Sequence, residues 1–134
     1  MSTIAHPRIL LVDDDDLVLD MYRRLLGRDF EIETARGAQE AIRALQHGPF
    51  AVIVSDFRMP GVKGDELLRR VKELAPATSR ILMTGALEGP NTSGQDDLWT
   101  TVCKPCPYPD LLAVLKREIL AYELRCNNNE LHHA

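Results

Sequence analysis

Cysteine is scarce in this sequence, with three residues among 134. So small and odd a number argues against a disulfide framework and fits a reducing compartment. Cys103 and Cys106 form a CxxC pair, but Lys104 and Pro105 lie between them where a redox motif would open a helix, and none of the four histidines stands at zinc-finger spacing. We therefore interpret both thiols as small buried residues at the end of a strand.

Long apolar segments are also lacking, since no stretch approaches the roughly 20 residues that a membrane-spanning helix needs. Residues 1–7 lack the charged and apolar regions of a secretory signal. Sixteen basic and twenty acidic side chains give a net charge of −4, which offers no attraction to nucleic acid or to anionic lipid. These absences predict a cytoplasmic protein without direct nucleic-acid or membrane contact, and 45% hydrophobic residues are enough for one folded domain.

Short apolar runs alternate with segments of helical periodicity along the chain. The expected strands are residues 8–12, 30–34, 50–55, 80–84 and 99–103, and the expected helices are residues 15–26, 38–46, 65–75 and 109–124. In the first expected helix, the apolar residues Val18, Tyr22, Leu25 and Leu26 recur at helical spacing. Residues 85–98 are rich in turn-forming residues and leave room only for a short or irregular fourth helix. The alternation predicts an α/β domain with a doubly wound parallel sheet and helices on both faces.

Polar residues follow the ends of the expected strands. Asp13 and Asp14 follow the first strand, Asp56 follows the third, Thr84 closes the fourth and Lys104 ends the fifth. Carboxyl ends of parallel strands share one edge of a sheet, where ligands bind. Carboxylates a few ångströms apart repel by roughly 4 kcal/mol per pair at an effective dielectric constant near 20, so they need a cation or a shared proton. Oxygen ligands with open positions for phosphate favour Mg²⁺.

Asp56 is the natural nucleophile of this group, because it ends the central strand and the loop after it turns sharply enough to face it toward the acidic pair. A divalent ion and Lys104 would screen the repulsion between this carboxylate and a phosphoryl group. Thr84 could donate its hydroxyl to one phosphoryl oxygen, and Lys104 could pair with another.

Four stretches carry a family resemblance. They are Ile9–Asp15 (ILLVDDD), Ser55–Gly64 (SDFRMPGVKG), Ile81–Ala86 (ILMTGA) and Lys104–Pro105. In this order and spacing, from about residue 7 to residue 124, the sequence resembles the receiver domains of two-component response regulators, such as the chemotaxis regulators. The resemblance implies a flavodoxin-like sheet of five parallel strands in the order 2-1-3-4-5.

The resemblance also implies a function in a phosphorelay, as a phosphoacceptor and not as an enzyme. Asp56 would accept a phosphoryl group from a sensor histidine kinase or a phosphotransfer protein. Asp13, Asp14, Asp56 and the backbone carbonyl of Arg58 would hold Mg²⁺. Thr84 and Lys104 would bind the acyl phosphate and report its presence by a conformational change. The Lys104–Pro105 bond is expected to be cis, as is frequent in the family.

Three features qualify this reading. Asp15 and Asp16 are more typical of acids at a helix N-terminus than of metal ligands. Thr101 stands three residues before Lys104, where the family usually has an aromatic switch residue, and Trp99 is a candidate substitute that we place on the opposite alternation of the strand. The segment between Thr84 and Lys104 is short for the family, so the output face is expected to be remodelled, with a different dimer or with signalling through the final helix.

The chain divides into an N-terminal tail (residues 1–6), a receiver domain (7–125) and a C-terminal tail or the start of a truncated linker (126–134), where the helical pattern is expected to dissolve. A free-standing receiver and a piece of a longer regulator both remain open, with a homodimer or a downstream effector as a further partner. Two other functions compete. A small Mg²⁺-dependent phosphatase would use Asp13 and Asp15 but needs a threonine where Leu17 stands, and a phosphorylation-independent binding module would keep the acidic pocket as a relic.

Overall fold

The computed structural model describes residues 6–85 and 99–133, with side chains up to residue 128. In chain order the elements are β1 (Arg8–Val12), α1 (Asp16–Leu26), β2 (Glu31–Ala35), α2 (Ala38–Leu45), β3 (Val52–Asp56), α3 (Gly64–Leu74), β4 (Ser79–Thr84), β5 (Thr100–Cys103) and α4 (Tyr108–His133). Except for the end of α4, these bounds lie within two residues of the expected ones. The expected short or irregular fourth helix falls on residues that lie outside the described part of the chain.

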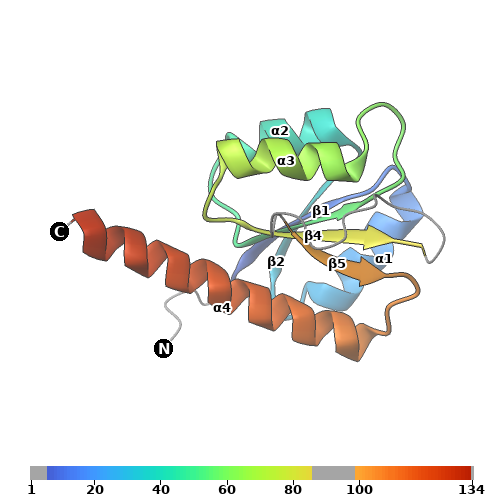
Figure 1. Ribbon diagram of the computed structural model, residues 1–134. Helices are drawn as coiled ribbons and strands as arrows, with labels where there is room; N and C mark the ends of the chain where they lie inside the picture. The colour runs from blue at the N-terminus through green and yellow to red at the C-terminus, as the bar shows by residue number, and fades with distance from the viewer. Residues whose placement is uncertain (1–5, 86–98, 134) are drawn as a thin grey trace.

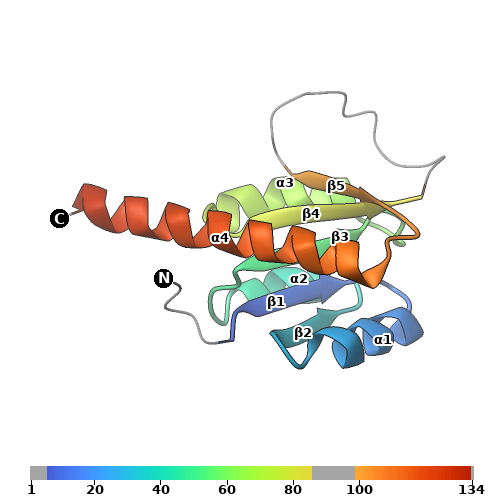
Figure 2. The same ribbon diagram turned by 90° about the horizontal axis from the view of Figure 1, so that it is seen from below.

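The five strands form one parallel sheet in the order β2-β1-β3-β4-β5, which confirms the predicted topology. Helices α2 and α3 lie on one face of the sheet, and α1 and α4 lie on the other (Figures 1 and 2). The order places β1 and β3 side by side at the centre, so their carboxyl ends meet. No helix among the described residues is long and apolar enough to cross a membrane.

Two apolar clusters sandwich the sheet, because successive strand residues point to opposite faces. On β1, Ile9 and Leu11 pack toward α1 and α4, whereas Leu10 and Val12 pack toward α2 and α3. Every residue of β3 is buried, as expected for a central strand covered on both sides. The core therefore holds the strand ends at fixed positions relative to each other.

Helix α4 is longer than the sequence indicated. It was expected to end near Leu124, but it continues through Asn127 and Asn128 to His133 and projects beyond the sheet (Figure 1). Asparagine is a weak helix former, yet each weak former costs only a fraction of a kilocalorie per mole, and residues 126–133 contain no glycine or proline.

Two expectations about β5 are wrong. Trp99 does not lie on the opposite alternation to Thr101: Trp99 packs in the same cluster as Leu82, the register partner of Thr101, because residues two apart on a strand share a face. Cys103 is exposed rather than buried, because the strand end leaves its outer face uncovered. Cys106 is partly buried, and both thiols are free.

Candidate functional site

An acidic cluster lies at the carboxyl edge of the sheet. The carboxylate oxygens of Asp13, Asp14 and Asp56 lie within 4.8 Å of one another. Asp56 is buried at the end of β3, Asp13 is partly buried after β1, and Asp14 is exposed. The adjacent central strands thus bring together the three acids that the sequence singled out. All donors are oxygen and one side is open to solvent, which fits the coordination that Mg²⁺ prefers.

Lys104 supplies the positive charge of the site. Its Nζ lies 2.5 Å from Oδ1 of Asp56, and its backbone N–H donates to the carbonyl of Thr84 at 2.7 Å. Thr84 is buried at the end of β4, on the same sheet edge. The Lys104–Pro105 peptide bond is cis, as expected. Lys104 therefore lines the cavity beside the acidic cluster, whereas Thr84 lies next to it at the same edge, joined to Lys104 by one backbone hydrogen bond but not itself among the cavity-lining residues.

The loop after Asp56 is held close to that residue. The N–H of Phe57 donates to the carbonyl of Met83 at 2.9 Å, which continues the contact between β3 and β4. At Gly64, the first residue of α3, a Cβ atom would lie 2.2 Å from the backbone oxygen of Asp56, so only glycine fits there. Arg58, on this loop, lines an open cavity of about 510 Å³ together with the acidic cluster and Lys104.

The electrostatics of the site favour a cation or a proton. Burial raises the pKa of the Asp13 carboxyl to about 6, a hydrogen bond from the N–H of Asp15 opposes the rise, and the charges of Asp56 and Asp14 add to it. Lys104 lowers the pKa of Asp13 only weakly by comparison. One lysine therefore does not neutralise this cluster, and a divalent ion would.

The two acids that follow the cluster have structural roles, as expected. Asp15 caps α1, with its Oδ1 accepting from the N–H of Leu17 at 2.9 Å. Asp16 pairs with Arg36 at 2.8 Å. Neither belongs to the group of carboxylates that could share an ion.

An apolar surface on α1 went unnoticed in the sequence. Leu17, Met21 and Leu25 recur every four residues, and their exposed fractions are 79%, 47% and 42%. Leu25 has the helical spacing noted in the sequence, but it is exposed because it lies beyond the edge of the face that packs on the sheet. The sequence signal for this surface is a second row of apolar residues at positions i, i+4 and i+8, which lie on one side of a helix. We call these three residues the α1 surface; it begins two residues after Asp15.

Comparisons with known proteins agree with this geometry. Residues 9–116 match the response regulator receiver domain family. The hydrogenase transcriptional regulatory protein HoxA of Cupriavidus necator is 31% identical over 129 residues, which cover 92% of this chain and 26% of that protein. The chain thus spans about a quarter of the length of this curated relative.

Solved structures show the same architecture. A crystal structure described as adenylate cyclase from Rhodopirellula baltica is similar with a TM-score of 0.87 and 31% identity, covering 96% of this chain and 98% of that one. A CheY-like response regulator receiver domain protein from Methanospirillum hungatei JF-1 is similar with a TM-score of 0.81 and 28% identity, covering 90% and 98%. Both are matched over almost their whole length.

Proposed function

The chain belongs to the response regulator receiver domain family of two-component systems, and on that premise we propose that Asp56 accepts a phosphoryl group from the phosphohistidine of a sensor histidine kinase or a phosphotransfer protein. The observation that carries this proposal is the convergence of Asp13, Asp14, Asp56 and Lys104 at one edge of the sheet. In this role the domain is a signalling phosphoacceptor and does not turn over a substrate.

We assign the metal site to the side chains of Asp13, Asp14 and Asp56 and to the backbone carbonyl of Arg58. The three carboxylates offer hard oxygen donors within 4.8 Å, beside an open cavity that Arg58 also lines. When bound there, Mg²⁺ would neutralise the carboxylates and attract phosphoryl oxygens. The raised pKa of Asp13 supports the assignment, because it marks an acidic cluster whose negative charge is incompletely balanced.

Asp56, Lys104 and Thr84 have different roles in the proposed phosphoryl transfer. Lys104 holds Oδ1 of Asp56, so we assign the attack on phosphorus to Oδ2. A P–O bond forms, the P–N bond of the phosphohistidine breaks, and the released imidazole nitrogen takes up a proton. The hydroxyl of Thr84 donates to one phosphoryl oxygen and Nζ of Lys104 to another. Since Lys104 and Thr84 share a backbone hydrogen bond, a shift of one moves the other.

We assign docking of the phosphodonor to the α1 surface. Leu17, Met21 and Leu25 expose an apolar stripe along a helix that begins beside the acidic cluster. An amphipathic helix of a partner could pack on this stripe and bring its histidine toward Asp56. For the output we favour α4, where Leu120 and Leu124 are exposed at 56% and 55% and could contact an effector or a second copy of the chain. Thr101, small and exposed, offers no aromatic switch.

Incubation with acetyl phosphate and Mg²⁺, read by intact mass, tests the proposal. We expect one phosphoryl adduct on the wild type, none on Asp56→Asn, and an undiminished adduct on the matched control Asp15→Asn, whose amide oxygen can still cap α1. Lack of an adduct on the wild type, under conditions that label other receivers, would favour the relic binding module. Sustained hydrolysis of phosphate monoesters would favour the phosphatase.

A further inference from the structure

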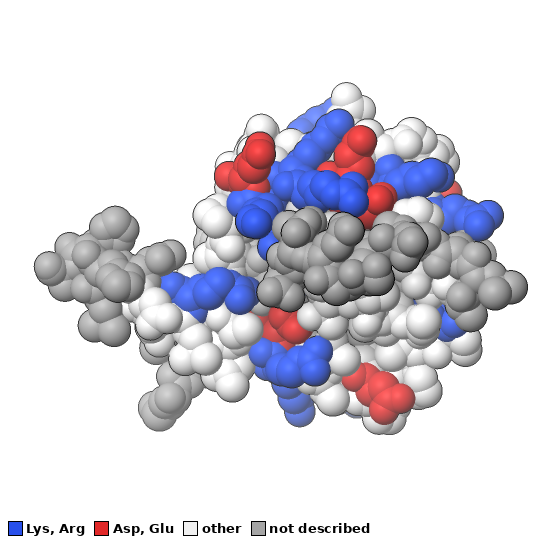
Figure 3. Space-filling model, viewed as in Figure 1, with Lys and Arg blue, Asp and Glu red and all other residues white. Residues whose placement is uncertain are grey.

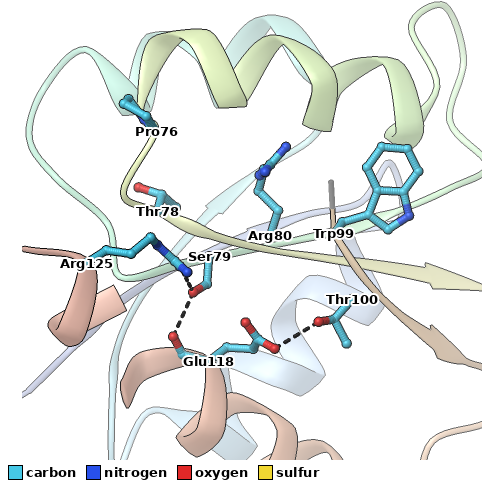
Figure 4. Close-up of a pocket in the computed structure, with 8 residues that line it drawn as sticks. All are labelled: Pro76, Thr78, Ser79, Arg80, Trp99, Thr100, Glu118 and Arg125. Atoms are coloured by element: carbon cyan, nitrogen blue, oxygen red, sulfur yellow. Dashed lines mark hydrogen bonds between the residues drawn. The ribbon is translucent and has the colours of Figure 1, made fainter. Parts of the chain in front are cut away.

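A second polar pocket lies where β4 begins, at the opposite end of the strand from Thr84. Its volume is about 260 Å³. The lining residues come from the start of β4, the start of β5 and the middle of α4, and they are Pro76, Thr78, Ser79, Arg80, Trp99, Thr100, Glu118 and Arg125 (Figure 4). We call it the arginine pocket. None of these residues lines the cavity at the acidic cluster, so the arginine pocket is a separate site.

Two guanidinium groups dominate the arginine pocket. Arg125 reaches from α4 to the start of β4, where its Nε donates to the carbonyl of Ala77 at 2.9 Å and its NH2 group donates to Oγ of Ser79 (Figure 4). Arg80 points toward α3 and donates to the carbonyl of Leu68 at 3.2 Å. In the described part of the chain, neither guanidinium has a carboxylate oxygen within 4 Å. Each therefore bonds to neutral oxygens and keeps further N–H donors for a ligand.

Among the described lining residues, Glu118 carries the single carboxylate, and this group already has other partners. Oε2 of Glu118 accepts from the hydroxyl of Thr100 at 2.8 Å and lies 3.5 Å from Arg117. The pKa of the Arg80 guanidinium is lowered, first by burial and then by the positive charge of Arg125. Among the described residues that line the pocket, two cations thus face it without a carboxylate paired to either. Figure 3 shows Lys and Arg side chains, with Asp and Glu among them, over α3 and α4 on this side of the molecule.

We propose that the arginine pocket binds a small oxyanion, a phosphate or carboxylate group, between Arg80 and Arg125. Guanidinium groups offer planar pairs of N–H donors that match such oxyanions, and a partly shielded site strengthens the attraction. The volume lies just below that of typical small-molecule sites, so the ligand is a compact anion rather than a large cofactor. Glu118 would accept from a hydroxyl or amino group that the same ligand carries.

Trp99 provides a direct readout, because it lines the arginine pocket and is the single tryptophan of the sequence. Its fluorescence is titrated with inorganic phosphate, ribose 5-phosphate and malonate, at matched ionic strength and without Mg²⁺. The titration is run on the full chain carrying Asp56→Asn, so that the acidic site cannot contribute a phosphoryl adduct. A saturable change is expected, and the three probes distinguish a free phosphate, a phosphorylated metabolite and a dicarboxylate as sources of the oxyanion.

The variants Arg80→Gln and Arg125→Gln should each weaken binding of the oxyanion probe at least tenfold. The matched control Arg70→Gln removes an exposed arginine that pairs with Glu66, and it should leave probe binding unchanged. Arg125 also ties α4 to the sheet, so Arg80→Gln carries the test if Arg125→Gln fails to fold. A linear change of equal size in the wild-type pocket and in all variants would overturn the proposal. Saturable binding that survives Arg80→Gln would also overturn it. Neither result bears on labelling of Asp56.

Discussion

Replacing Asp13 with Asn is expected to stabilise the metal-free domain while it weakens Mg²⁺ binding. The substitution removes one of the three clustered charges and preserves the shape of the side chain. The amide oxygen can still accept the hydrogen bond that the N–H of Asp15 donates to Asp13 at 2.9 Å. The effect therefore reports the charge and not a lost backbone contact.

The magnitude follows from the pKa of Asp13, which burial raises from 3.8 to about 6. In a fully shielded group this shift is equivalent to about 3 kcal/mol of stability. Because the carboxyl is only partly buried, solvent screening reduces the expected gain to about 1–2 kcal/mol. The folded-state pKa lies above the unfolded one, so the charged carboxyl destabilises the fold fully above about pH 6, and the cost disappears as the pH falls toward 3.8.

Urea denaturation in the presence of a chelator measures this gain, at about pH 7.5 and again at about pH 4. Asp13→Asn should exceed the wild type in free energy of unfolding at the higher pH and match it at the lower. Asp29→Asn, at an exposed acid between α1 and β2, serves as the control and should show neither effect. Titration calorimetry should show at least tenfold weaker Mg²⁺ binding to Asp13→Asn. A variant no more stable than the wild type at the higher pH would refute the reasoning.

Three further substitutions probe the site and its surroundings. Gly64→Ala should lower the free energy of unfolding, measured in urea, by about 2–3 kcal/mol, because the added Cβ would lie 2.2 Å from the backbone oxygen of Asp56. The control Gly37→Ala adds a Cβ with nothing within 4 Å, so its free energy of unfolding should differ from that of the wild type by less than about 0.5 kcal/mol. Lys104→Met removes a cation beside the acidic cluster, so calorimetry should show several-fold tighter Mg²⁺ binding; weaker binding would contradict the assigned metal site. Met21→Glu should slow transfer from the cognate kinase about tenfold but leave labelling by acetyl phosphate intact, and an equal loss with both donors would argue against docking on the α1 surface.

The acidic site could be predicted from the sequence because its position depends on topology. Asp56 and Lys104 are 48 residues apart, yet both follow strands of a parallel sheet, and such strands end at one edge. The apolar runs that identify the strands therefore also place the functional residues. The close contact between Gly64 and the backbone of Asp56 could not be predicted from the sequence, since it depends on how closely α3 approaches the end of β3.

Other features depend on exposure and side-chain direction, which apolar periodicity does not specify. Leu25 fits the buried stripe of α1 by spacing but lies beyond its edge. Arg80 and Arg125 come from separate elements at a strand start, where no sequence rule gathers polar residues as the carboxyl edge does. The end of α4 does not follow from the asparagines, because these weak helix formers do not stop a helix where glycine and proline are absent.

The projecting end of α4 has a mechanical consequence. Arg125 fastens the helix to the start of β4, and the eight residues beyond it extend about 12 Å at 1.5 Å per residue. When a rigid helix tilts about one fixed point, the displacement increases with distance from that point. A tilt of about 10° at Arg125 would therefore move the C-terminal end of α4 by about 2 Å. Small rearrangements near the sheet would thus be converted into a displacement large enough for another surface to sense.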